Sequence, residues 1–229
     1  LEAKVVDRQF RQDVRPLLAP GVPFDLAAAA WIRTELLQRL DEREPSFLFD
    51  PDTAGLLVVD VQEKLWPFIH DREAVLKRTL QAIEIAGRLE LPILVTEQYV
   101  KGLGPTIPEV RKALEAFDAY KPIEKLAFSC FGEAALAAAF EGSGIETLAL
   151  VGIEGHVCVM QTALEALDRE IDVFYIAEAI GSRDPSHKAE AVARVRDAGA
   201  VVGSVEMFAF EAMRGSKHQA FRAVQKVIL

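Results

Sequence analysis

Three residues of this chain, Asp60, Lys125 and Cys158, carry side chains that together suit nucleophilic catalysis. A thiolate attacks carbonyl carbon, a nearby ammonium group stabilises it, and a carboxylate can accept the thiol proton and return it to a leaving group. Each residue ends or follows a short apolar run, in VVD, PIEK and LVGIEGHVC. The combination therefore suits acyl transfer through a thioester.

Cys158 lies where a helix is expected to begin, because Val159, Ala163 and Leu167 form an apolar stripe at i, i+4, i+8 spacing. A thiol at a helix N-terminus lies near the positive end of the helix dipole and near unbonded N–H groups, which favour the thiolate. The same N–H groups can bind the oxyanion of a tetrahedral intermediate. We therefore expect the pKa of the Cys158 thiol to be lowered.

Ordinary structural roles compete with this interpretation. A free cysteine in an α/β protein is most often a small core residue, and an isolated lysine is usually solvated. Cys130, in AFSCFGE, fits the core role better than Cys158 does, because no glycine-containing turn precedes it. We expect its thiol to be inert.

The elements that would position these residues follow from residue 55 onward, where short β-branched runs alternate with helical patterns. Each run is apolar on both faces and bounded by Gly, Pro or charged residues, as expected of strands covered by helices on both sides. The runs span residues 55–61, 92–97, 122–127, 147–153, 173–179 and 200–205. Since parallel neighbours need crossover connections, we predict an α/β fold with a six-stranded, mostly parallel, doubly wound sheet. Ligands bind such sheets beyond the carboxyl ends of the strands, near the point where strand order reverses.

Residues 1–50 differ from this pattern and are predicted to form an N-terminal helical extension to a domain that spans residues 51–229. The extension contains a Pro/Gly loop and a predicted helix that begins near Asp25 and carries Ile32, Leu36 and Leu40 on one face. A single amphipathic helix cannot close a core alone, so it must pack on its own domain or on another subunit. We therefore expect a homodimer or larger homo-oligomer.

Composition excludes several classes of protein. The net charge of −9 comes from 35 acidic against 26 basic residues, which disfavours binding to nucleic acid. Apolar runs end well short of the roughly 18 residues that a membrane span needs, so we expect no membrane partner. With two cysteines and no signal-peptide pattern at the start, the chain is expected to be cytoplasmic.

Three motifs, VVDVQEKL, KLAFSCF and LVGIEGHVCVMQTALEAL, resemble those of the isochorismatase-like cysteine hydrolases and occur in that family's order. Three further segments, TEQYVKGLGPT, GSRD and KHQAF, are most similar to the isochorismatase-domain-containing proteins. The resemblance implies a Rossmann-like three-layer fold for residues 51–229. It also implies that Asp60 is the general base, Lys125 the thiol-activating cation and Cys158 the nucleophile.

The resemblance further implies a cis peptide bond before Glu154, with the backbone N–H groups of Glu154 and Cys158 forming the oxyanion hole. Gly155 departs from the family pattern, which usually has Thr or Ala at this position. Such a change could loosen the turn but leaves the backbone donors in place.

A catalytic metal is not expected. Metal-binding nicotinamidases of this superfamily carry Asp-x-His after the second strand, where this chain has Glu97, Gln98 and Tyr99. None of the histidines shows HxH or HExxH spacing; they are His70, His156, His187 and His218. We expect no cofactor either.

The sequence thus predicts a metal-independent cysteine hydrolase that acts on a small amide or related acyl substrate. Two alternatives remain open: a non-catalytic binding or scaffold module on the same fold, and a vinyl-ether hydrolase of the isochorismate type. A small-molecule pocket is expected beside the triad, and its candidate lining residues are Gln62, Trp66, Gln98, Tyr99 and Phe131.

Overall fold

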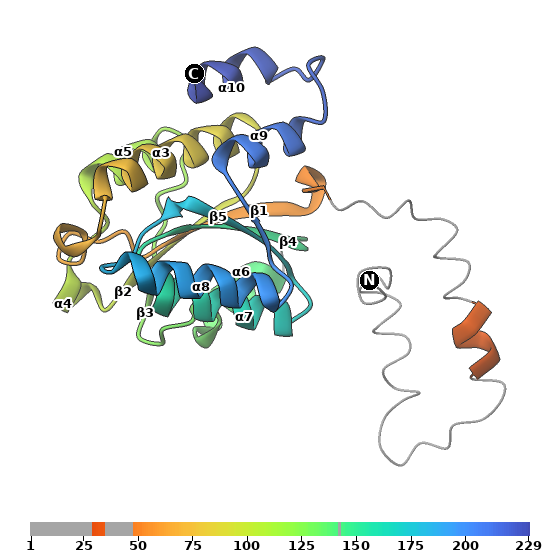
Figure 1. Ribbon diagram of the computed structural model, residues 1–229, viewed down its shortest axis with the longest axis horizontal. Coiled ribbons are helices and arrows are strands. Elements are labelled where there is room, and N and C mark those ends of the chain that lie inside the picture. The colour runs from red at the N-terminus through yellow and green to blue at the C-terminus, as the bar shows by residue number, and fades with distance from the viewer. Residues whose placement is uncertain (1–28, 35–47, 142) are drawn as a thin grey trace. The chain divides into compact units, whose positions relative to one another are not determined.

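The computed structural model describes residues 29–34, 48–141 and 143–229 (Figure 1). The chain divides into two units, residues 1–47 and 48–229. In the first unit, residues 29–34 are helical, as predicted for this stretch, whereas Asp25, Leu36 and Leu40 of the predicted helix lie outside the described residues. The predicted boundary between residues 50 and 51 stays a prediction.

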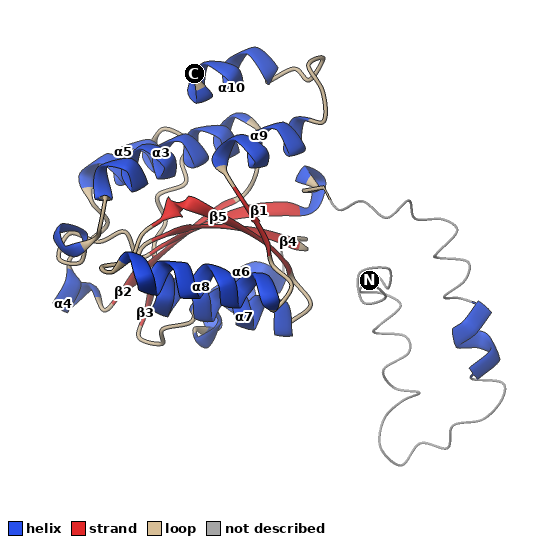
Figure 2. Cartoon of the chain, viewed as in Figure 1, coloured by secondary structure: helices blue, strands red, loops and turns tan. Residues whose placement is uncertain are grey.

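The second unit is built on a six-stranded sheet in which every neighbouring pair is parallel (Figure 2). The strand order is β3-β2-β1-β4-β5-β6. The strands are β1 (Ala54–Val59), β2 (Ile93–Gln98), β3 (Ile123–Lys125), β4 (Thr147–Gly152), β5 (Asp172–Ile180) and β6 (Val201–Gly203). The predicted α/β, doubly wound architecture is confirmed.

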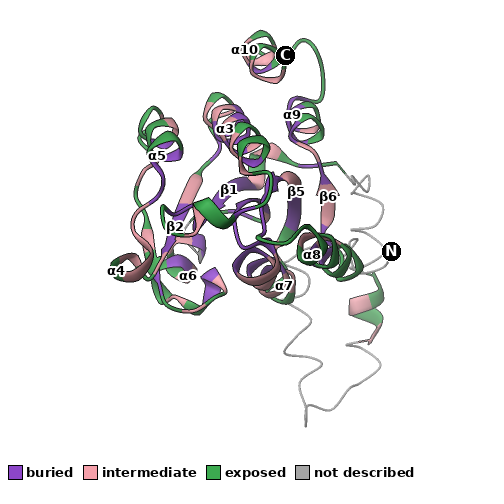
Figure 3. Cartoon of the chain, turned by 60° about the vertical axis from the view of Figure 1, so that its left-hand side comes forward, coloured by how far each residue is buried: buried purple, intermediate pink, exposed green. Residues whose placement is uncertain are grey.

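Helices cover both faces of this sheet, as Figures 1 and 3 show. One face carries α3 (Arg72–Arg88), α5 (Pro108–Glu115) and α9 (Val205–Met213), with α10 (Phe221–Ile228) outside them. The other face carries α6 (Ala134–Glu141), α7 (Met160–Asp168) and α8 (Pro185–Asp197). The short α4 (Val100–Leu103) follows β2. Among the described residues, no helix combines the length and the apolar character needed to cross a bilayer.

The central strand β1 explains why the predicted runs are apolar on both faces. Leu56 and Val58 pack in the core cluster on one face of the sheet, and Leu57 and Val59 pack in the cluster on the other. All four side chains are fully buried. Because successive side chains of a strand point to opposite faces, burial on both sides requires a continuous apolar run rather than an alternating one.

Strand order reverses at β1, which pairs with β2 on one side and with β4 on the other. The ends of β1 and β4 approach closely at Gly152, which has a φ of 143°. A Cβ atom at this position would lie 2.2 Å from the carbonyl oxygen of Val59, so only glycine fits. Beyond the strands, the chain turns through residues in the left-handed conformation, Asp60 (φ 52°) after β1 and Glu154 (φ 55°) after β4.

Two predicted strands are twice as long as the observed ones, with six residues against three. The run predicted at 200–205 ends at Gly203, because Ser204 accepts a hydrogen bond from Met207 N–H and begins α9. The run predicted at 122–127 ends at Lys125, where the carbonyl groups of the following loop turn toward the lysine side chain.

Candidate active site

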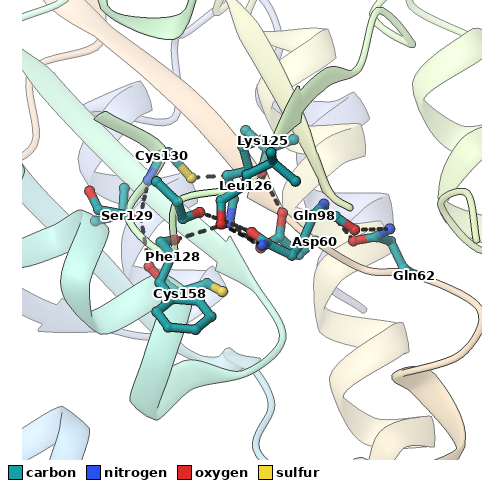
Figure 4. A network of polar contacts seen from close by, with 12 residues as sticks. Asp60, Gln62, Gln98, Lys125, Leu126, Phe128, Ser129, Cys130 and Cys158 are labelled. Atoms are coloured by element: carbon teal, nitrogen blue, oxygen red, sulfur yellow. Dashed lines mark hydrogen bonds and ion pairs between the residues drawn. The ribbon is translucent and has the colours of Figure 1, made fainter. Parts of the chain in front are cut away.

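The structure brings Asp60, Lys125 and Cys158 together at the carboxyl edge of the sheet (Figure 4). Asp60 follows β1, Lys125 ends β3, and Cys158 lies in a π-helical turn, Gly155–Val159, that follows β4. Their exposed fractions are 0%, 1% and 4%. The site therefore lies at the reversal of strand order, where doubly wound sheets bind ligands.

The Lys125 ammonium group is surrounded by oxygen atoms. Its Nζ lies 2.7 Å from Asp60 Oδ2 and donates to Gln98 Oε1 (2.7 Å) and to the carbonyl oxygens of Ala127 (3.1 Å) and Phe128 (3.0 Å). A buried ammonium group needs such partners because it has lost its water. Burial is the largest single effect and lowers the pKa of Lys125, but the combined electrostatic effects of Asp60, Cys158 and Cys130, with the hydrogen bond to Asp60, outweigh it, so the net pKa is raised. Lys125 is therefore held as a fixed positive charge.

The two carboxylate oxygens of Asp60 have different partners. Oδ1 accepts a hydrogen bond of 2.8 Å from the buried Thr96 hydroxyl. Oδ2 faces Lys125 in the ion pair and accepts no further hydrogen bond of good geometry from the described residues. One oxygen is thus anchored by Thr96, and the other is held in the ion pair with Lys125.

The expectation of a low-pKa thiol at Cys158 is wrong. Burial raises the pKa of Cys158 most, and the charge of Asp60 and a hydrogen bond to its carboxylate raise it further, while Lys125 lowers it. The physical reason is that a desolvated thiolate beside a carboxylate is disfavoured more than one ammonium group can offset. Burial and the neighbouring carboxylate therefore favour the protonated thiol at Cys158.

The turn that carries Cys158 departs from two expectations. The described residues contain no cis peptide bond, so the predicted cis bond before Glu154 is wrong; the chain enters the turn through the left-handed conformation of Glu154 instead. The α-helix predicted to begin near Cys158 begins at Met160, because Gly155–Val159 form a wider π-helical turn. No described group accepts a hydrogen bond from Glu154 N–H, so this donor is unoccupied as an oxyanion hole requires.

Cys130 is fully buried, and burial raises the pKa of its thiol to about 11. Its backbone N–H donates to the Thr162 hydroxyl (3.0 Å), which in turn donates to the carbonyl oxygen of Cys158 (2.7 Å). Cys130 thus supports the turn that carries Cys158 through its backbone, and its shielded thiol agrees with the inert role predicted for it.

The predicted pocket residues occupy different environments. Gln62 is buried and binds backbone groups, accepting from Gln98 N–H (2.7 Å) and donating to the carbonyl oxygens of Gln98 (2.9 Å) and Gly104 (2.6 Å). The Gln98 side chain in turn accepts from Lys125 and donates to the Leu126 carbonyl oxygen. These two glutamines hold Lys125 in place.

The three aromatic candidates differ in exposure. Trp66 is half-buried against the core, Tyr99 is 47% exposed, and Phe131 is buried against Phe140 with a ring separation of 5.2 Å. Of these, Tyr99 has the most surface available to a ligand. Substrate contact by the five predicted residues stays a prediction.

Sequence reasoning missed several residues that organise the site, namely Thr96, Thr162, Ser182 and Arg183. A threonine next to a buried strand position carries no distinctive signal. For Ser182 and Arg183 the GSRD motif at 181–184 was a usable signal, because it places both residues just after a predicted strand.

The residues in place of the nicotinamidase metal motif do not fit a metal. Glu97 is buried, and its Oε1 accepts hydrogen bonds from Thr106 N–H (2.8 Å), the Thr106 hydroxyl (2.7 Å) and the Tyr120 hydroxyl (2.9 Å). Within residues 29–34, 48–141 and 143–229, no group of three or more His, Cys, Asp or Glu side chains could hold a metal ion. This carboxylate instead anchors the loop that leads to α5.

Two surface cavities, of about 380 and 470 Å³, lie away from the triad. The first is lined by residues of α9 with Leu48, and the second by residues near the ends of α3 and α10. Neither contains a residue of the triad. The chemistry of the buried triad, rather than the presence of a hollow, identifies the candidate site.

Comparisons with a family model and with known proteins both point to the isochorismatase domain. The chain matches the family model of the isochorismatase domain over residues 54–207. It is 33% identical over 179 residues to isochorismatase domain-containing protein 2A of Mus musculus, covering 78% of this chain and 84% of that protein.

Two solved structures share the fold. A structure described as MAR1 ribonuclease from Caenorhabditis elegans has a TM-score of 0.73 at 33% identity and covers 79% of this chain and 92% of that one. The YcaC gene product of Escherichia coli, described as an octameric hydrolase of unknown specificity, has a TM-score of 0.71 at 23% identity and covers 81% and 98%.

Proposed function

Because this chain belongs to the isochorismatase family, we propose that it is a metal-independent cysteine hydrolase that cleaves a small amide or related acyl compound. The observation that carries the proposal is the buried cluster of Asp60, Lys125 and Cys158, in which an ion pair of 2.7 Å lies beside a thiol. Burying charged groups has an energetic cost, and ionisable groups buried together are frequent at functional sites. Catalysis explains their presence together.

In the proposed reaction, Cys158 Sγ attacks the substrate carbonyl carbon while Asp60 Oδ2 takes the thiol proton. The carbonyl electrons move to oxygen, and the resulting oxyanion binds the N–H groups of Glu154 and Cys158. The carbon–nitrogen bond then breaks, and Asp60 returns the proton to the leaving amine. This step leaves a thioester on Cys158.

Hydrolysis of the thioester completes the cycle. Asp60 removes a proton from water as the water oxygen attacks the thioester carbon, and the second tetrahedral intermediate expels the Cys158 thiolate. The thiolate recovers its proton from Asp60, and the acid product leaves. Throughout, Lys125 stabilises the negative charge that passes between Asp60 and Cys158.

A panel of small amides and esters, assayed with the wild type and Cys158→Ala, tests the proposal. We expect turnover of at least one compound by the wild type, loss of turnover in the variant, and an acyl adduct on the Cys158 peptide by mass spectrometry. Equal turnover by the two proteins would contradict the proposal.

Metal independence is tested separately by extended dialysis against a strong chelator. Because Glu97 is bound to Thr106 and Tyr120, we expect turnover to be unchanged and no stoichiometric zinc, iron or manganese by elemental analysis. Loss of activity that one of these metals restores would contradict this part of the proposal.

The 4% exposure of Cys158 favours one alternative, a non-catalytic binding or scaffold module that retains the fold. An unreactive Cys158 in the native protein, with no turnover across the panel, would support that module. RNA cleavage, named for the Caenorhabditis elegans relative, is not part of the proposal, because acidic residues outnumber basic ones by 35 to 26.

We further propose that the protein is cytoplasmic and forms a homodimer or larger homo-oligomer. The octameric state named for the Escherichia coli structure supports self-association. Sedimentation velocity on the full chain tests self-association, and a monomer at micromolar concentration would contradict the proposed homo-oligomer.

A further inference from the structure

The turn that carries Cys158 is tied to the loop between β5 and α8 by backbone contacts. Gly155 N–H donates to the Gly181 carbonyl oxygen (2.8 Å), and Gly181 N–H donates to the Gly152 carbonyl oxygen (2.9 Å). The buried Tyr175 hydroxyl donates to the Gly155 carbonyl oxygen (3.2 Å). Gly155 thus lies against this loop.

Gly155 also sets how closely the two segments approach. A Cβ atom there would lie 2.7 Å from Ile180 Cγ2 and 3.0 Å from the Ser182 hydroxyl oxygen. A residue with a side chain would therefore push the loop away. The absence of a side chain brings Ser182 and Arg183 within reach of the nucleophile's turn.

An ion pair between Arg183 and Glu154 also links the loop to the turn, and Glu154 is the residue whose N–H group is proposed to bind the oxyanion. Arg183 Nε and Nη2 donate to the two carboxylate oxygens of Glu154 at 3.0 and 3.2 Å. The Glu154 side chain is 8% exposed, whereas that of Arg183 is 58% exposed. A buried carboxylate without a partner is unfavourable, and a bidentate guanidinium fixes its orientation as well as its charge. Arg183 thereby restrains a left-handed residue whose N–H group is unoccupied.

His156, two residues after Glu154 in the same turn, also contacts the loop between β5 and α8. Its Nδ1 hydrogen-bonds with the buried Ser182 hydroxyl (3.2 Å), and its Nε2 lies 3.8 Å from Glu154 Oε2. The charged or titratable groups that face it are Glu154, Arg183, His187 and Asp184. Burial lowers the pKa of His156, so the ring is neutral at pH 7 and Arg183 is the cation that pairs with Glu154.

We propose that Arg183, with Ser182, is a positioning residue that clamps the nucleophile's turn and holds the Glu154 N–H group where the substrate oxyanion forms. This inference rests on the proposed cysteine hydrolase function. It predicts that loss of the clamp slows reactions that form an oxyanion more than reactions that need only the sulfur.

Two probes separate these effects. Acylation by p-nitrophenyl acetate passes through an oxyanion, whereas alkylation by iodoacetamide displaces iodide and forms none. Arg183→Gln should slow acylation of Cys158 about tenfold or more while changing its alkylation less than about twofold. Arg183→Lys should recover part of the acylation rate, because it keeps the charge but loses the bidentate geometry.

Glu154→Gln should slow acylation of Cys158 to a similar degree. The double variant with Arg183→Gln should be acylated no more slowly than either single variant, since each single substitution already removes the same contact between Arg183 and Glu154. Arg111→Gln is the control for loss of an exposed arginine: Arg111 is 52% exposed, similar to Arg183, but its partner Glu115, 2.8 Å from Arg111 Nε, is 49% exposed instead of buried. Circular dichroism checks that each variant is folded, and Arg183→Lys and Glu154→Gln carry the test if Arg183→Gln does not fold.

Acylation that is unchanged in folded Arg183→Gln, or that falls in step with alkylation, overturns the clamp alone. A wild type that is alkylated but never acylated at Cys158 overturns the proposed function and the clamp with it.

Discussion

At the scale of single residues, the two oxygens of the Asp60 carboxylate have different partners, which suits the separate tasks that we propose for them. Thr96 fixes Asp60 Oδ1, so Oδ2 keeps its direction when it gains or loses a proton. Lys125 offsets the charge on that oxygen at 2.7 Å. A raised pKa at Cys158 favours the protonated thiol, which is less reactive toward oxidants and alkylating agents than a thiolate.

This arrangement predicts that removing the base makes the thiol more reactive. The charge of Asp60 raises the pKa of Cys158, so Asp60→Asn should lower that pKa and increase the thiolate fraction at pH 8. Iodoacetamide should then alkylate Cys158 at least about threefold faster than in the wild type, while turnover is lost. Peptide mass spectrometry at several pH values measures the rates.

Lys125→Met provides the opposite control, because loss of the ammonium group should raise the pKa of Cys158 and slow its alkylation. In all of these proteins Cys130 should react more slowly than Cys158, since it is fully buried. Preferential labelling of Cys130 in the native wild type would show that the nucleophile is assigned to the wrong thiol.

Thr96 tests the anchoring of Asp60. Thr96→Val removes the hydroxyl that donates to Oδ1 and leaves a buried charged acceptor without that partner, so we expect a loss of about 1.5–3 kcal/mol in the free energy of unfolding. Denaturant titration measures the change. Thr96→Ser keeps the hydroxyl and should lose clearly less; equal losses in the two variants would assign the effect to packing.

Sequence could single out Asp60, Lys125 and Cys158 as candidates because each has a distinctive side chain in a recognisable motif. It could not identify Thr96 or the direction of the Cys158 pKa, because both depend on three-dimensional neighbours. The pKa of a thiol reflects burial and nearby charge together, and sequence spacing suggests only the favourable part.

At the scale of elements, the strands were predictable because the covered sheet requires apolar residues on both faces. The ends of the elements were less predictable, as local hydrogen bonds decide them. Ser204 ends one apolar run by beginning α9, and Glu154 enters a π-helical turn where an ordinary helix start was expected. Both features place side chains at the sheet edge, where a shift of one residue changes the site.

The contact between β1 and β4 gives a prediction at this scale. Gly152→Ala would put a Cβ atom 2.2 Å from the Val59 carbonyl oxygen at a φ of 143°, so we expect a loss of about 3 kcal/mol or more in the free energy of unfolding. Gly144→Ala is the control, because Gly144 also has a positive φ (70°) but no atom lies within 4 Å of an added Cβ. A similar loss in both variants would show that backbone conformation, and not the close approach, explains the glycine.

At the scale of the whole second unit, the sheet separates two core clusters and leaves its carboxyl edge for chemistry. Each cluster is buried by helices on its own face, so the edge can carry polar and charged groups without loss of core packing. The reversal of strand order at β1 brings residues from β1, β3 and β4 to one place. The sequence predicted this convergence because Asp60, Lys125 and Cys158 each end or follow an apolar run, and the runs were expected to form parallel strands.

The limits of this unit can be tested with two truncated chains, starting at Leu48 and at Pro51. Phe49 is 4% exposed and packs edge-on against Phe174 and Phe208, with ring centroids 5.5 and 5.0 Å apart. Its N–H group donates to Glu211 (2.9 Å), and its carbonyl oxygen accepts from Arg214 (2.9 Å).

The chain starting at Leu48 keeps all of these contacts and should unfold cooperatively in denaturant. The chain starting at Pro51 lacks Phe49 and should be about 3–5 kcal/mol less stable, the cost of removing a buried phenylalanine side chain. Within the longer chain, Phe49→Ala should reproduce most of this loss. Equal stability of the two truncated chains would instead support a domain that begins at residue 51, because the core would then not depend on Phe49.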